Sequence, residues 1–139
     1  MSASKLKIII FSLLTLFLLI SCSETKTTNP QKAYRYWTGS DPPAGTEVFN
    51  GQYWRSAHWT LEYIVYLKFK PTDIWWSDFL KRNNLVEDKE DWSIPIDAPN
   101  WFKPPDSSVR YRFDRNFYNN SRYFRDSLTN ICYVYEIQL

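Results

Sequence analysis

The chain has 139 residues, of which 44% are hydrophobic and 19% are aromatic. Seventeen Lys and Arg residues against 15 Asp and Glu residues give a net charge of +2, which does not indicate a general attraction to nucleic acid or anionic lipid. This length allows one domain of ordinary size and no more, and the seven Trp and ten Tyr let so small a domain bury much area per residue.

The first 22 residues have the pattern of a targeting signal. Lys5 and Lys7 form a short positive segment, and a nearly unbroken apolar run follows from Ile8 to Ile20. A membrane-spanning helix needs about 20 apolar residues. This run gives way to polar residues directly after Cys22, so it is too short to span a bilayer and indicates a signal peptide.

The end of this run, Leu19-Ile20-Ser21-Cys22, resembles the lipobox of bacterial lipoproteins. The resemblance covers only these first 22 residues. It implies that residues 1–21 are removed and that Cys22 is acylated on sulfur and on its new amino group, with palmitate among the acyl chains. Two or three chains hold a protein at a bilayer durably. The alternatives are an ordinary secretory signal or an uncleaved anchor.

By the same resemblance, Ser rather than Asp at position 23 favours the outer membrane of the bacterial cell envelope, without indicating which face. Removal of the signal peptide also removes Lys5 and Lys7, which leaves 15 basic residues against 15 acidic ones. With Cys22 acylated, Cys132 has no partner for a disulfide within the chain. Its alternating apolar surroundings predict a small buried hydrophobe, and the alternative is a reactive or intermolecular thiol.

We expect residues 22–33 to form the lipidated cysteine and a flexible tether, because the segment is polar and Asn29-Pro30 disfavours a helix. Residues 34–139 then form a single globular domain. Tyr34–Trp37 could be a short first strand. Asn50-Gly51 lies between apolar residues and predicts a type I′ hairpin turn, because both central residues of that turn need φ > 0.

The clearest predicted strand is Thr60–Lys70, in which apolar and mixed positions alternate. Pro71 ends it, and Thr72 or Asp73 caps a helix that runs to about Asn83. Asn84 then suits a left-handed helix end. The buried stripe of the helix is predicted to comprise Trp75, Trp76, Phe79 and Leu80.

The segment 87–105 is rich in Pro and carries Trp92, Trp101 and Phe102, so we expect it to be an ordered loop. Val109–Phe113 alternates as a strand, and Arg122–Asp126 and Ile131–Gln138 flank a turn as a terminal hairpin. Strands, one helix and further strands predict an α+β fold, a small antiparallel sheet with one main helix packed on one face.

The usual catalytic signatures are absent, and a single histidine excludes most sets of metal ligands, so we predict no cofactor and no metal. Ser56, His58, Thr60 and Glu62 would share one face of an early strand as nucleophile, base and orienting residues. Such neighbours stand about 6.5 to 7 Å apart, too far for the hydrogen bonds of a triad. A His hydrogen-bonded across strands is the alternative.

Asp73 and Asp78 are a second pair that catalysis could use, as the two carboxylates of a glycosidase. Five residues on a helix separate them by more than a full turn. A helix cap and a solvated face explain them better.

Charge is uneven along the chain, with seven acids against three bases in 73–97 and six bases against two acids in 103–125. These segments either face each other or one of them faces a partner. The basic segment interleaves Arg with aromatic residues, as platforms for single-stranded nucleic acid do, but a lipoprotein outside the cytoplasm does not meet that partner. The Arg residues could instead pair across strands with Glu62, Glu136 and Asp126, or bind an acidic ligand or partner protein. The candidate binding residues are Trp92, Trp101, Arg110 and Arg112.

Two functional classes remain. The first is a membrane-anchored binding or interaction domain in the envelope, whose role could be ligand capture, envelope assembly with a protein partner, or neutralisation of a toxin as an immunity-type protein. The second is a small envelope hydrolase that uses His58. Trp, Tyr and Arg dominate interface hot spots, so their abundance favours the first class.

Overall fold

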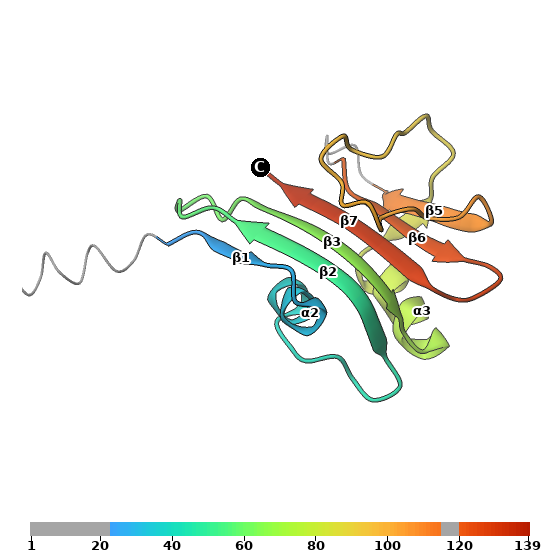
Figure 1. Ribbon diagram of the computed structural model, residues 1–139. Helices are drawn as coiled ribbons and strands as arrows, with labels where there is room; N and C mark the ends of the chain where they lie inside the picture. Colours follow the sequence, from blue (N-terminus) through green and yellow to red (C-terminus); the bar gives the residue numbers. More distant parts are fainter. Residues whose placement is uncertain (1–22, 115–119) are drawn as a thin grey trace, which may run out of the picture.

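The computed structural model describes residues 23–114 and 120–139, so the predicted signal peptide and Cys22 lie outside the described part. Seven strands form one antiparallel sheet in the order β1-β2-β3-β7-β6-β5-β4 (Figure 1). The strands are β1 (Thr25–Thr27), β2 (Glu47–Arg55), β3 (Tyr63–Lys70), β4 (Leu85–Glu87), β5 (Ser108–Phe113), β6 (Arg122–Asp126) and β7 (Cys132–Gln138).

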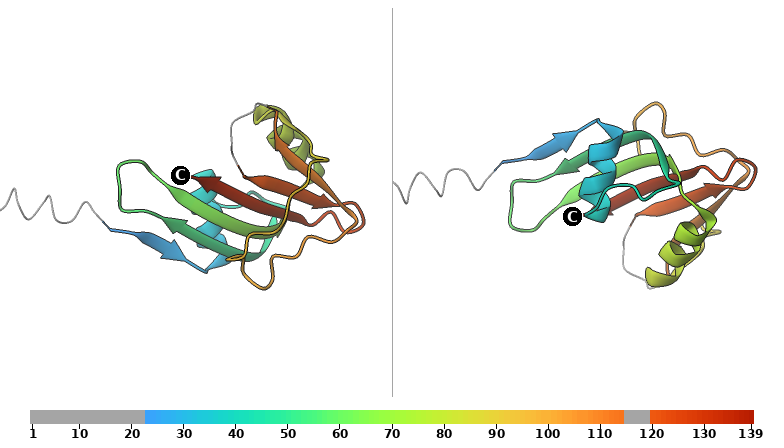
Figure 2. Two further views of the ribbon diagram at one scale, coloured as in Figure 1. Left: turned by 90° about the horizontal axis from the view of Figure 1, so that it is seen from above. Right: turned by 90° about the horizontal axis from the view of Figure 1, so that it is seen from below.

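Two short helices, α2 (Pro30–Thr38) and α3 (Asp73–Arg82), lie on one face of the sheet, and the segment between β4 and β5 crosses the other face (Figure 2). The predicted α+β fold with one main helix and a small sheet is therefore wrong, because the fold is dominated by a seven-stranded sheet. In the part of the chain that the structure describes, no helix is long and apolar enough to cross a membrane.

Much of this error lies in residues 25–38, where β1 and α2 replace the expected tether and first strand. Asn29 caps α2, and its Oδ1 accepts a hydrogen bond from the backbone N–H of Lys32 at 2.9 Å. Pro30 occupies the first helical turn, where its missing N–H costs nothing and its fixed φ favours the helix. The Asn29-Pro30 pair disfavours a helix that would run into it from earlier residues. It favours a helix that starts at Pro30, as α2 does.

The predicted hairpin at Asn50-Gly51 is also wrong, because both residues lie inside β2. Gly51 is needed there for another reason. A Cβ atom at Gly51 would lie 2.7 Å from the Cβ of Ala33 and 3.0 Å from the Cα of Pro30. The absent side chain lets α2 pack directly against the sheet.

Other local predictions are confirmed. β3 forms over Tyr63–Lys70 of the predicted strand, whose first three residues lie in the preceding loop. α3 occupies the expected segment, with Thr72 as its N-cap and Asn84 in the left-handed region at φ 50°. β5 and the β6–β7 hairpin also form where the alternation predicted them. Cys132 is fully buried, as expected.

The core has two parts, one on each face of the sheet. The helix side packs buried residues of β3 and β7 against α2 and α3, with Tyr34 and Trp76 among the largest side chains. On the opposite side, Phe102 of the β4–β5 segment is buried against Tyr66 and Tyr133. The segment from Asp88 to Ser107 thus forms a layer that covers the second face of the sheet.

Candidate functional site

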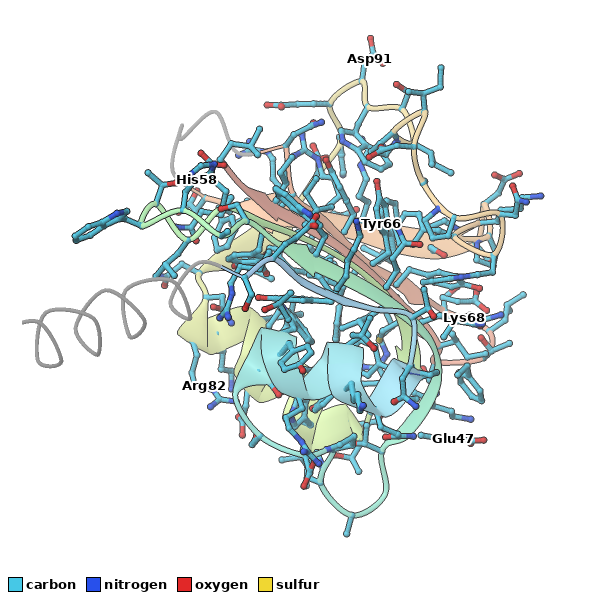
Figure 3. The ribbon with its side chains drawn as sticks, turned by 60° about the vertical axis from the view of Figure 1, so that its left-hand side comes forward. Glu47, His58, Tyr66, Lys68, Arg82 and Asp91 are labelled. Carbon is cyan, nitrogen blue, oxygen red and sulfur yellow. The ribbon has the colours of Figure 1, made fainter. Side chains whose placement is uncertain are left out.

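The proposed hydrolase residues lie in the loop between β2 and β3 rather than on a strand. His58 is exposed at the end of the molecule, away from both helices (Figure 3), whereas Ser56 is buried and its Oγ has no hydrogen-bond partner. The backbone N–H of Ser56 donates to the carbonyl of Glu62 at 2.8 Å, but no hydrogen bond joins the side chains of these three described residues. Nucleophile, base and orienting group are not assembled.

A different acidic residue, Glu136 on β7, lies at the centre of a polar network under the helices. Its Oε2 accepts hydrogen bonds from the indole Nε1 of Trp37 at 3.0 Å and from the hydroxyl of Tyr123 at 2.6 Å, and its Oε1 accepts one from the hydroxyl of Tyr63. All three donors are neutral. Within the described residues no Lys, Arg or His forms an ion pair with Glu136.

The pKa values of the two tyrosine hydroxyls in this network are raised. Burial is the main cause at Tyr123 and Tyr63, and the negative charge of Glu136 together with its hydrogen bond to each hydroxyl adds to it. Both hydroxyls therefore stay protonated and continue to donate to the carboxylate across the physiological pH range.

Glu136 lines a cleft of about 540 Å³ between the C-terminal ends of α2 and α3. Aromatic rings of Tyr34, Trp37, Trp75 and Phe79 line it, in contact with one another at centroid distances of 5.2 to 6.4 Å. The polar rim carries Asp41, which pairs with Arg35, and Arg82, the last residue of α3 (Figure 3). The arrangement can bind a group that brings a positive charge to Glu136 and apolar surface to the rings.

The candidate binding residues Trp92, Arg110 and Arg112 do come together, but around a carboxylate of the same chain. Asp88 is fully buried, and its Oδ2 lies 2.8 Å from Nε of Arg110 and 2.6 Å from Nε of Arg122. Arg112 approaches Oδ1 at 3.6 Å without a hydrogen bond from its Nε. The guanidinium groups of Arg110 and Arg122 lie over the Trp92 ring at 5.9 and 6.0 Å from its centroid.

This Asp88 cluster joins the acidic segment 73–97 to the basic segment 103–125, so the first of the two charge hypotheses is confirmed. Asp73 and Arg125 form a second ion pair between the same segments. Among the described residues, no Arg forms an ion pair with the predicted partners Glu62, Glu136 or Asp126. Asp126 instead accepts hydrogen bonds from the hydroxyls of Ser107 and Thr129. Trp101 lies apart from the cluster and packs against Phe102.

A second concavity of about 570 Å³ lies on the opposite face of the sheet. Trp54, Ile64 and Tyr66 form its apolar part, and Asp97 stands at its rim, where its Oδ1 accepts a hydrogen bond from the hydroxyl of Tyr66 at 3.2 Å. None of the described residues that line it is an acidic side chain held by several hydrogen bonds as Glu136 is, so the cleft between the helices is the stronger candidate.

From the sequence alone, Glu136 is predicted only as a partner for Arg. A signal was present, because Cys132, Val134 and Glu136 alternate and therefore share one face of β7. A carboxylate on a face that also carries buried apolar residues needs partners.

Among the described residues, no group of three or more His, Cys, Asp or Glu side chains could hold a metal ion. Comparison of the chain with protein-family models, with curated proteins and with solved structures found no match.

Proposed function

We propose that this chain is a bacterial lipoprotein, anchored in the cell envelope through acylated Cys22, whose β-sheet domain is a binding module. The lipobox-like Leu19-Ile20-Ser21-Cys22 supports the anchor, and Ser23 supports the outer membrane as its location. The module takes its ligand, or part of a protein partner, in the cleft between α2 and α3.

One observation carries the binding role: Glu136 is a partly buried carboxylate whose hydrogen-bond donors, among the residues that the structure describes, are all neutral. A carboxylate without a cationic partner attracts positive charge, and aromatic rings favour contact with ammonium groups. The chemistry therefore fits an amine, supplied either by a small ligand or by a Lys side chain of an envelope protein. Ser56, His58 and Glu62 share one loop of the described chain, but no hydrogen bond joins their side chains, so they give no comparable support to a hydrolase.

The anchor is tested with Cys22→Ala in the full chain. We expect this variant to keep residues 1–21 and to carry no acyl chain, because the sulfur that receives the lipid is absent. Mass spectrometry of the N-terminal peptide after metabolic labelling with a palmitate analogue reads out both effects. Ser21→Ala, which retains the Cys, serves as the control and stays labelled. An acylated Cys22→Ala protein would contradict the proposal.

The binding role is tested by calorimetry with two amine probes, putrescine and Nα-acetyl-lysine amide, and with acetate as the anionic control. We expect binding of at least one amine, and Glu136→Gln should weaken it about tenfold or more, because a hydrogen bond to a charged group contributes about 1.5–3 kcal/mol. Glu47→Gln, an exposed carboxylate of β2 (Figure 3), is the matched control.

Preference for putrescine would point to a small ligand and preference for the lysine amide to a protein partner. If neither amine binds, or if Glu136→Gln and Glu47→Gln bind the amine equally well, the cleft is not the binding site. Circular dichroism of Glu136→Gln checks that the fold is retained. The single Gln oxygen can still accept from two of the three donors, and a Tyr hydroxyl can accept from the Gln NH2.

A further inference from the structure

The loop between β2 and β3, residues 56–62, carries the most exposed aromatic side chain of the described residues. Trp59 is 98% exposed and Leu61 is 58% exposed. Trp side chains are large and mainly apolar, so nearly complete exposure to water is unfavourable unless a partner covers the ring. The loop, which we call the Trp59 tip, therefore needs an explanation that the cleft between the helices does not supply.

The position of the Trp59 tip relative to the start of β1 supplies that explanation. In the register of the sheet, Thr25 lies opposite Arg55, and Arg55 lies opposite Tyr63. The chain therefore enters β1 at the end of the sheet where the loop projects, as Figure 1 shows. The β6–β7 turn lies at the other end.

Cys22 and Trp59 can extend to similar distances beyond the end of the sheet. Cys22 is three residues before Thr25, which spans at most about 10 Å. Trp59 is the midpoint of the loop, four residues beyond Arg55 and four before Tyr63, so it projects by a similar distance. A lipid-anchored Cys22 leaves no room for a long spacer between the bilayer and the tip.

The charges of the described segments 23–27 and 55–62, which include β1 and the Trp59 tip, are balanced. Glu24 and Lys26 form an ion pair at 3.3 Å, Arg55 donates to the hydroxyl of Thr25 at 3.2 Å, and Glu62 supplies the second acid. A surface with two acids and two bases has no strong attraction to anionic headgroups. Contact at this end would depend on apolar area.

We propose that the Trp59 tip inserts into the interface of the bilayer that holds Cys22. Trp is enriched at membrane interfaces because its ring is mainly apolar and its N–H meets the polar headgroups. The insertion is a second, non-covalent contact that fixes the orientation of the domain and directs the opposite end of the sheet away from the membrane. This inference rests on the proposed acylation of Cys22.

Site-directed spin labelling of the full acylated chain tests the orientation. Trp59→Cys places one reactive thiol at the tip, because Cys22 carries lipid and Cys132 is fully buried, which raises the pKa of its thiol. Leu128→Cys, at an 82% exposed position of the β6–β7 turn, is the matched control. Each labelled protein is reconstituted in vesicles of phosphatidylethanolamine and phosphatidylglycerol.

We expect the label at residue 59 to collide severalfold more often with oxygen, which dissolves in the bilayer, than with a water-soluble nickel chelate. The label at residue 128 should show the reverse. High salt should leave both results unchanged, because the contact is apolar. Equal exposure of both labels to the nickel chelate would overturn the inference.

A second measurement keeps the native Trp59. In vesicles whose lipids carry bromine near the headgroup end of the acyl chains, the wild-type chain should lose part of its Trp fluorescence, and Trp59→Phe should abolish that loss. Mass spectrometry of the same samples reports the acylation. A chain that is acylated but unquenched refutes the tip contact alone, whereas a chain without acyl groups refutes the proposed anchor and the tip contact together.

Discussion

At Gly51, α2 packs directly against the sheet. The neighbouring Ala33 is fully buried, and Pro30 begins the helix directly over β2. Neither atom near Gly51 is the far end of a flexible side chain, so an added methyl group must push α2 away from the sheet.

We expect Gly51→Ala to lower the free energy of unfolding by about 1–3 kcal/mol, the usual cost of overpacking. Urea denaturation at pH 7 measures it. Ala33→Gly removes the methyl group nearest to the new Cβ, so the double variant should be less destabilised than the sum of the two single variants. If the effects of the two single variants simply add in the double variant, the contact with Ala33 is not the cause of the destabilisation by Gly51→Ala.

Glu136 shows how one residue can stabilise and bind at once. Its three neutral donors satisfy part of its hydrogen-bonding capacity and hold it in one orientation beside the cleft. A carboxylate has about four acceptor positions, so one remains for a ligand donor. The same network therefore prepares the site before any ligand arrives.

At the scale of elements, the Asp88 cluster attaches the segment between β4 and β5 to the sheet. The N–H of Asp88 donates to the carbonyl of Arg110 at 2.7 Å, and its carboxylate binds guanidinium groups of β5 and β6. Burial alone raises the pKa of Asp88, but the N–H of Glu90 and the charges of Arg122 and Arg110 outweigh it and hold the pKa below its ordinary value.

Asp88→Asn should lower the free energy of unfolding at pH 7 by about 3 kcal/mol, because it removes the buried anion that Arg110 and Arg122 bind. Since the pKa of Asp88 is lower in the folded state, its contribution is complete above the pKa of the unfolded chain, about 4. The contribution is lost as the pH falls through the folded-state pKa. Urea denaturation at pH 7 and near pH 2 should therefore show a difference between wild type and variant that shrinks in acid.

Asp91→Asn is the matched control for this cluster, because Asp91 belongs to the same segment but is exposed and points away from the sheet (Figure 3). It should change stability little at either pH. An effect of Asp88→Asn that is independent of pH would indicate that shape, rather than charge, gives the residue its role.

At the scale of the whole molecule, the short connection between Cys22 and β1 limits how the domain can be oriented relative to the proposed lipid anchor. Because Thr25 already belongs to the sheet, only Ser23 and Glu24 separate the proposed lipid anchor from the folded domain. A long flexible tether would let the domain rotate freely above the bilayer. With only two residues between them, the proposed anchor would also set which end of the sheet faces the membrane.

The sequence by itself determined the elements whose signals are local. The alternation of β3, β5 and β7 and the capped amphipathic α3 were predictable, because burial of one face and helix capping depend on neighbouring residues. The lipobox-like segment is a local signal as well, and it remains a prediction because it lies outside the described residues.

Tertiary structure decided the rest, because the partners are distant in sequence. β1 exists only through pairing with β2, and α2 packs where it does because Gly51 leaves room for it. Glu136 gains its role from Trp37, 99 residues away, and from Tyr63 on another strand. The register of the sheet brings the loop that carries Trp59 to the same end as the start of β1, and no local pattern encodes that arrangement.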